Sequence, residues 1–188
     1  FMKAVSIMGE NNSLSKSFII DNADHGLYEG TGGAALFLGY LGEITKKDIY
    51  KEAAQALINN IKKDYKKNKN INSISAFLGY GSLVYIFTHL ATIWNDNNLL
   101  EDAEEFVKEI YPMVDSDKSL DLLTGASGCI LGILPLAYLS RNSKAKKIAI
   151  KCGNFLLKKE KNGQSNWMSL EIKRGFSHGF SGVALALN

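Results

Sequence analysis

The sequence predicts an all-α protein, an α/α toroid (barrel) in which inner and outer helices alternate along the chain. Three observations support this prediction. A glycine-containing motif recurs four times, an apolar run follows each motif, and segments with a single apolar stripe lie between the motifs. A helix that is apolar all round is typically buried, and a helix with one stripe lies outside it. No alternating pattern typical of a β-strand runs for a useful length.

The recurring motif has apolar residues, a glycine, two further residues, a small residue and then an apolar run. It occurs as LYEGTGGAALFLGYL (27–41), FLGYGSLVYIFTHL (77–90), LLTGASGCILGILPL (122–136) and FSHGFSGVALAL (176–187). The leading glycines Gly30, Gly79, Gly125 and Gly179 are 49, 46 and 54 residues apart, which indicates an internal repeat. We expect the small residues to let a loop turn sharply and a helix begin close to its neighbours. They do not match the phosphate-loop pattern GxxxxGK[ST].

The segments between the motifs have the period of amphipathic helices and are predicted to form the outer layer. Their expected stripes are Ile49, Ala53, Leu57 and Ile61 in the first; Leu99, Ala103, Phe106, Val107 and Ile110 in the second; and Ala145, Ile148, Ala149, Cys152, Phe155 and Leu156 in the third. Each repeat unit is therefore a loop, an inner helix, a connection and an outer helix.

The chain is predicted to consist of a lead-in segment (1–26) and a partial toroid domain (27–188). The fourth inner helix begins near Ser181, and the chain ends at Asn188 before an outer partner for it. About three and a half units leave an apolar seam, so we expect the seam to be covered, or the toroid to be completed by a longer chain. A first residue Phe1 in place of Met also indicates a segment of a longer protein.

Composition narrows the class of protein. A net charge of +3, from 22 basic and 19 acidic residues, is too mild to indicate nucleic-acid binding. No apolar run reaches the ~18–20 residues that span a bilayer, and no secretory signal is visible. The two cysteines, Cys129 and Cys152, form no disulfide framework and lie in apolar helical runs, so we predict structural roles and a cytoplasmic location.

The ordered motif set resembles the lanthionine cyclase (LanC-like) family, and most of all the C-terminal cyclase domain of class II (LanM-type) lanthipeptide synthetases. The resemblance runs from about Leu27 to Asn188. Its more specific features are an Asp four residues before the third glycine and a His directly before the fourth. The family fold is a toroid of seven inner and seven outer helices, so the resemblance covers about the N-terminal half of that domain.

This resemblance implies a function in lanthipeptide (lantibiotic) biosynthesis. Family members add Cys thiols of a dehydrated precursor peptide to dehydroalanine or dehydrobutyrine, which closes thioether rings. A zinc ion held by two Cys and one His binds the substrate thiol, and zinc coordination deprotonates a thiol. The enolate formed by thiolate attack then needs a proton from a general acid.

Two residues of this chain match family residues near that centre. The resemblance assigns His178 as a candidate catalytic acid or base, and Asp121 as a residue that assists the His or positions the reacting groups. Simpler roles stay open at this point. An isolated His at a helix start often caps the helix or is a satisfied core group. Asp121 is equally suited to accepting loop N–H groups near a helix N-terminus.

The zinc ligands of the family are not found in this sequence. The family has them on later motifs, as a Cys after a Trp and then as a Cys-His pair followed by Gly, whereas no Cys follows Cys152 here. We therefore expect no metal or other cofactor in this segment, zinc ligands beyond residue 188 in the full-length protein, and no ring closure by the segment alone. The implied partners are the precursor peptide, the remainder of the cyclase domain and an upstream dehydratase domain.

Other candidate residues and functions receive less support. His25 and His89 have no motif match and are predicted to be structural, while Tyr28 and Trp167 either line a peptide groove or belong to the core. One alternative function is a glycoside-processing or terpenoid-cyclising toroid enzyme, for which Glu29 and Asp121 would be the facing carboxylates of a glycosidase. Another is a non-catalytic helical scaffold that binds peptides or thiols.

Overall fold

The structure is a computed structural model that describes residues 3–8, 17–22, 24–68, 71–140, 144–161 and 175–188. Within the lead-in segment, β1 (Lys3–Met8) and β2 (Ser17–Asn22) pair as an antiparallel hairpin, with Lys3 opposite Asn22 and Met8 opposite Ser17. The sequence analysis predicted no strand there. The helical fold class predicted for the rest of the chain is confirmed.

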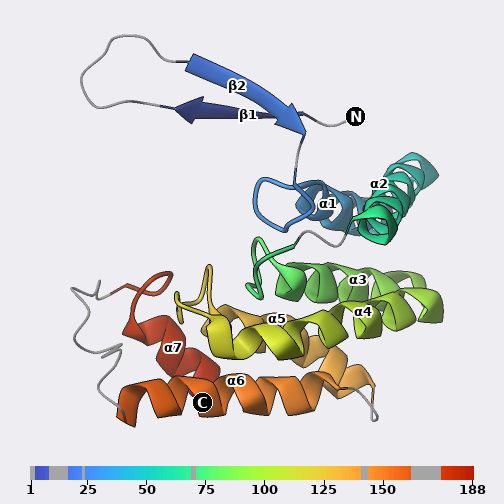
Figure 1. Cartoon of the computed structure of the whole chain (residues 1–188). Coiled ribbons are helices and arrows are strands. Elements are labelled where there is room, and N and C mark those ends of the chain that lie inside the picture. Colours follow the sequence, from blue (N-terminus) through green and yellow to red (C-terminus); the bar gives the residue numbers. More distant parts are fainter. Residues whose placement is uncertain (1–2, 9–16, 23, 69–70, 141–143, 162–174) are drawn as a thin grey trace.

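Inner and outer helices alternate along the chain as predicted (Figure 1). The inner helices are α1 (Thr31–Thr45), α3 (Tyr80–Trp94), α5 (Ala126–Leu139) and α7 (Phe180–Leu187). The outer helices are α2 (Asp48–Lys67), α4 (Asn97–Ile110) and α6 (Ala145–Lys161), and a 3-10 helix η1 (Tyr111–Ser116) follows α4. Each outer helix packs on the inner helix before it, and α1, α3, α5 and α7 contact one another in chain order.

None of the described helices is both long enough and apolar enough to cross a bilayer.

The core lies between the two layers and is centred on α3. This helix contacts α1 and α5 on its sides and α4 from the outer layer, so most of its side chains are buried. Phe87 of α3 and Phe106 of α4 meet edge to face, with ring centroids 4.9 Å apart. Such aromatic pairs contribute stabilisation beyond the area that they bury. The stripe predicted for α4 is buried in full.

The stripe predicted for α2 is wrong in part. Ile49 is 67% exposed, and the buried residues of this helix are Ala54, Ile58 and Ile61. The predicted positions were four residues apart, but an α-helix turns every 3.6 residues, so a strict spacing of four drifts around the helix. The spacing of four and three between the buried residues follows the true period and keeps them on one face.

The inner helices are also less uniformly buried than predicted. Phe37 and Ile44 of α1 are 64% and 76% exposed, and Tyr138 of α5 is 83% exposed. By contrast α3, which lies between two inner neighbours, buries ten residues. Among the described helices, α1 packs on one inner neighbour only, which explains the exposure of Phe37 and Ile44, whereas Tyr138 lies one residue before the end of α5.

The loops before the inner helices share one backbone arrangement. In the first three repeat units, the N–H three residues after the motif glycine donates to the carbonyl four residues before it. These bonds are Gly33 N to Gly26 O at 3.1 Å, Ser82 N to Ser75 O at 3.1 Å, and Gly128 N to Asp121 O at 3.2 Å. Each loop thus folds back on the first turn of its helix, which explains the small residue at the donor position.

Gly128 shows how little space this arrangement leaves. A Cβ added to Gly128 would lie 1.8 Å from the carbonyl oxygen of Leu122, a backbone atom that cannot move aside without opening the loop. Gly153, in the middle of α6, has nothing nearer to an added Cβ than a Leu187 methyl group at 3.8 Å. A side chain would therefore clash with the backbone at Gly128, whereas Gly153 has room for a methyl group.

We predict that Gly128→Ala lowers the free energy of unfolding by about 1–3 kcal/mol, because the new methyl group overpacks the loop. Gly153→Ala is the matched control and should raise it by about 0.5–1 kcal/mol, since Ala is the better helix former. Urea unfolding followed by circular dichroism measures both variants. Equal effects of the two substitutions would contradict the close approach seen at Gly128.

Candidate functional site

The loops that precede α1, α3, α5 and α7 all lie at the same end of the helical layers (Figure 1). Both residues matched to the family's reacting centre are in these loops. Asp121 lies in the loop before α5, and His178 is the residue directly before Gly179, the N-cap of α7. The site is therefore built from loop residues held by a rigid helical scaffold, a common arrangement for functional sites.

Two backbone hydrogen bonds join the loops before α5 and α7. The N–H groups of Leu122 and Leu123 both donate to the carbonyl of Ser177, at 3.2 and 3.3 Å. Asp121 directly precedes Leu122, and His178 directly follows Ser177. The backbone contact therefore brings the two candidate residues together, although they are 57 positions apart in the sequence.

His178 and Asp121 are in direct contact. The Nδ1 atom of His178 lies 2.7 Å from Oδ2 of Asp121. A carboxylate oxygen accepts, so the imidazole donates through Nδ1 and its Nε2 atom carries the lone pair when the ring is neutral. The His178 side chain is 44% exposed and that of Asp121 is 14% exposed. The pair thus has a sheltered carboxylate and a solvent-facing imidazole, with no other described residue bonded to Nε2.

The first two loops make the same backbone contact without these side chains. Leu27 N and Tyr28 N donate to the carbonyl of Phe77, at 2.8 and 3.1 Å. In the repeat register, Gly26 stands where Asp121 stands and Leu78 stands where His178 stands. A Cβ at Gly26 would lie 2.6 Å from Phe77 O, so that position has no room for a side chain. Joining two loops therefore does not require a His and an Asp.

Asp121 has a structural role in addition to its contact with His178. Its Oδ1 atom accepts from the N–H of Thr124 at 2.7 Å and from the Thr124 hydroxyl at 3.0 Å, which closes the turn. Ser75, the equivalent residue of the second motif, accepts from Leu78 N at 3.0 Å through its single oxygen. A serine is therefore sufficient to cap this turn. The second carboxylate oxygen is the feature that Asp121 adds, and this oxygen contacts His178.

The sequence analysis missed a second carboxylate that supports this loop. Asp117 Oδ2 accepts from Leu120 N at 3.2 Å and from Ala126 N at 2.9 Å, and its Oδ1 accepts from Ser119 N at 3.4 Å. Ala126 opens α5, where a negative charge interacts favourably with the helix dipole. Asp117 thereby ties both ends of the loop that contains Asp121.

Leu120, directly before Asp121, has an unusual backbone conformation. Its φ of 59° lies in the left-handed region, which a bulky residue adopts only at a cost of about 1–3 kcal/mol. Its side chain is buried, its N–H is held by Asp117, and its carbonyl accepts from the hydroxyl and the N–H of Ser127. These contacts fix the direction in which the chain enters Asp121. The sequence signal for them was an Asp eight residues before the third motif glycine, where the first two repeats have Asn22 and Ile71.

The other two histidines lie away from the His178–Asp121 pair. His25 contacts Thr31 through Nδ1 at 3.0 Å, and its Nε2 lies 3.5 Å from Asp64 of α2, so it links the first loop to an outer helix. His89 of α3 forms a 2.8 Å hydrogen bond with the hydroxyl of Tyr40, and burial lowers its pKa. Both environments are consistent with the structural roles predicted for them.

Two of the remaining candidates, Tyr28 and Glu29, lie in the first loop. Tyr28 is 60% exposed. Glu29 is exposed and adopts a left-handed φ of 58° in the first loop. That loop is hydrogen-bonded to the loop before α3, whereas the loop of Asp121 is hydrogen-bonded to the loop before α7, so these backbone contacts do not bring the two carboxylates together. Trp167 lies outside the described residues.

The described residues do not fit the zinc site that the resemblance implies. No group of three or more His, Cys, Asp or Glu side chains within the described ranges is placed to hold a metal ion. Cys129 of α5 and Cys152 of α6 are both fully buried. A hydrogen bond with Cys152, together with burial, raises the pKa of the Cys129 thiol, which therefore stays protonated. The two thiols lie where α5 and α6 pack together, so they contribute to the contact between the two layers.

The alternating layers and the loop-borne site place the chain among α/α-toroid proteins. The family model described as "Lanthionine synthetase C-like protein" matches residues 21–188, and the chain belongs to this family. The family is of the lanthionine synthetase type, whose cyclases act on precursor peptides. No curated protein matches the chain.

We predict that Asp121→Asn changes the tautomer of His178 while the loop stays folded. The amide oxygen can still accept from Thr124, but its NH₂ group would donate to Nδ1 of His178 and move the ring proton to Nε2. The free energy of unfolding should change by less than about 1 kcal/mol. Ring ¹⁵N chemical shifts report the tautomer, and the signals of His25 and His89 are internal controls. An unchanged His178 signal would show that the Asp121 contact does not orient the ring.

A second prediction separates Asp117 from its neighbour Asp115. Asp117→Ala leaves loop N–H groups without their acceptor and should cost about 1–3 kcal/mol of unfolding free energy. Asp115 is 72% exposed and forms a single ion pair with Lys151, so Asp115→Ala should cost less than about 1 kcal/mol. Urea unfolding of both variants measures the difference. Similar costs would mean that the Asp117 hydrogen bonds do not hold the loop.

Proposed function

We propose that this chain is part of a lanthionine cyclase of the class II (LanM) type, and that it forms the N-terminal half of the cyclase domain. The proposed reaction is the intramolecular addition of Cys thiols to dehydroalanine or dehydrobutyrine in a dehydrated precursor peptide. The observation that supports it most directly is the 2.7 Å contact between His178 and Asp121, in the loops of a LanC-like chain. The chemistry of this pair suits a reaction that moves one proton.

The proton balance of the reaction assigns a role to each residue. As a thiol adds to the alkene, a carbon–sulfur bond forms at the β-carbon, and the π electrons move toward the carbonyl to give an enolate. The thiol loses one proton, and the α-carbon gains one. With Nδ1–H donated to Asp121, the exposed Nε2 of His178 is free to accept the first proton and to deliver the second. Asp121 orients the ring through Nδ1.

The proposal also includes a zinc ion and further partners in the complete enzyme. Zinc would lower the pKa of the substrate thiol, and its ligands would lie beyond residue 188. The dehydrated peptide would come from a dehydratase domain upstream of the chain, and the reaction would take place in the cytoplasm. This segment alone would then close no rings.

We predict that His178→Asn in the full-length protein lowers the rate of ring closure by about 10²–10⁴-fold, the usual contribution of a general acid or base. Dehydration of the precursor should continue unchanged. Ring closure consumes thiols, so alkylation with N-ethylmaleimide followed by mass spectrometry counts the rings that remain open. His25→Gln is the matched control, since His25 also lies in a motif loop but is held by Thr31 and Asp64. Normal ring closure in His178→Asn would exclude the proposed role.

A further inference from the structure

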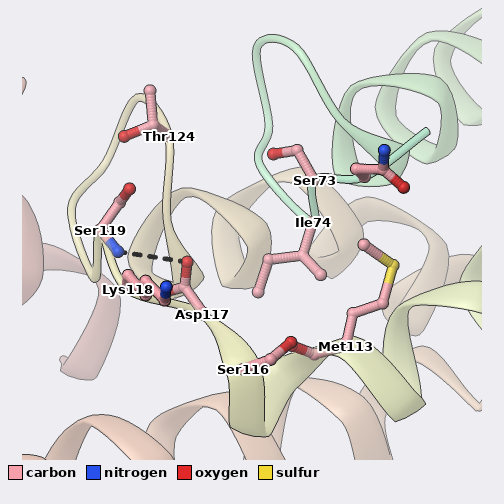
Figure 2. Close-up of a pocket in the computed structure, with 9 residues that line it drawn as sticks. Ser73, Ile74, Met113, Ser116, Asp117, Lys118, Ser119 and Thr124 are labelled. Carbon is pink, nitrogen blue, oxygen red and sulfur yellow. Dashed lines mark hydrogen bonds between the residues drawn. The ribbon is translucent and has the colours of Figure 1, made fainter.

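A cavity of about 340 Å³ opens between the loop before α3 and the loop before α5. Figure 2 shows Ser119 and Thr124 on one side of it and Ser73 and Ile74 on the other, with Met113 of η1 below. The volume is within the range of about 300–1,000 Å³ typical of small-ligand pockets. The sequence analysis did not predict this cavity.

The two walls of the cavity are fixed by hydrogen bonds within the protein. On the α3 side, the carbonyl of Ser73 accepts from Tyr80 N at 2.9 Å, and its hydroxyl accepts from Ser75 N at 3.2 Å. On the α5 side, Asp117 holds the backbone of Ser119 and Leu120. The cavity is therefore preformed, and a ligand would bind without ordering either loop.

Thr124 links the cavity to the His178–Asp121 pair. It lines the cavity, and its hydroxyl and N–H both donate to Oδ1 of Asp121. The other oxygen of the same carboxylate contacts His178 at 2.7 Å. The Asp121 side chain therefore bridges Thr124 of the cavity lining and the imidazole of His178.

The lining suits a peptide main chain better than an apolar ligand. The hydroxyl of Ser119 has no hydrogen-bond partner among the described residues, and the hydroxyl of Ser73 has a proton left to donate. Ile74 and Met113 add a small apolar surface, as mixed binding sites commonly do. Asp117 already receives three N–H groups and has little capacity left for a ligand.

Lys118 gives the cavity its charge preference. Its side chain is exposed, and it forms no ion pair with an acidic residue of the described chain. An ammonium group beside neutral hydroxyls attracts a carboxylate of the ligand. The Asp117 carboxylate in the same lining is occupied by three loop N–H groups, so a peptide with small polar residues and an acidic side chain matches both the hydroxyl-bearing walls and the cation at the rim.

We propose that this cavity is a subsite for the substrate peptide, which holds a short extended segment with an acidic residue toward Lys118 while the reacting residues lie at His178. The inference rests on the proposed function, because it takes the substrate to be a peptide. The subsite would fix which part of the peptide reaches the imidazole, and so would influence which thiol and alkene meet.

The test uses the ¹⁵N-labelled 188-residue chain and the probe peptide acetyl-Ser-Gly-Ser-Glu-amide, which has neither thiol nor alkene. We expect saturable shifts of the Ser73, Ser119 and Thr124 amides, with a dissociation constant on the order of 1 mM. Replacing Glu by Gln in the probe, or Lys118→Ala in the protein, should weaken binding about two- to fivefold, the effect of one exposed ion pair. Equal binding of the Glu and Gln probes would overturn the role of Lys118.

A blocking variant tests the cavity itself. Ser119→Trp places a large ring in the cavity from an exposed position and should weaken probe binding at least about tenfold. Asn60→Trp, on the exposed face of α2, is the control and should bind the probe normally. No saturable shifts, or shifts unaffected by Ser119→Trp, would overturn the subsite. Because the probe cannot cyclise, this result is independent of the His178→Asn assay, which tests the proposed function separately.

Discussion

The site depends on one backbone contact, in which the N–H groups of Leu122 and Leu123 share the carbonyl of Ser177. Side-chain attraction alone would not select this geometry, because a pair whose imidazole is 44% exposed gains little from its contact in water. The contact between the loops sets the backbone positions of the neighbouring Asp121 and His178. Only the rotamers of the two side chains then remain to be fixed for them to meet. The loops can approach this closely because the first turn of α7 has a small residue at the contact: a Cβ added to Gly182 would lie 2.9 Å from the Cβ of Leu122.

The repeat provides an internal comparison that separates structure from chemistry. The loops before α1 and α3 make the same contact with Gly26 and Leu78 at the equivalent positions, and Ser75 caps the same turn as Asp121. Folding is therefore satisfied by glycine, leucine or serine at these places. The fold therefore does not require a carboxylate or an imidazole at these positions. Their presence supports a functional role independently of the family assignment.

Much of this organisation could be predicted from the sequence, because it is periodic. The glycine spacing gave the repeat, the 3.6-residue period gave the stripe of α4, and the motif match gave His178 and Asp121. Features without a period were missed. Asp117, which accepts from three backbone N–H groups, and the left-handed Leu120 have no periodic signal in the sequence. The burial predicted for Ile49 was wrong because the predicted stripe used a strict spacing of four residues, whereas an α-helix has 3.6 residues per turn.

The protein's own thiols are consistent with the proposed reaction. A cyclase that handles dehydrated residues meets electrophilic alkenes, and an exposed thiolate of the enzyme would compete with the substrate thiol. Cys129 and Cys152 are both fully buried between α5 and α6, and the pKa of Cys129 is raised, so the reactive thiolate form is disfavoured. His178, by contrast, faces solvent at the loop end, with Nε2 free and Nδ1 held by Asp121. The described chain thus buries the groups that would themselves be alkylated and exposes the imidazole to which the proposed function assigns proton transfer.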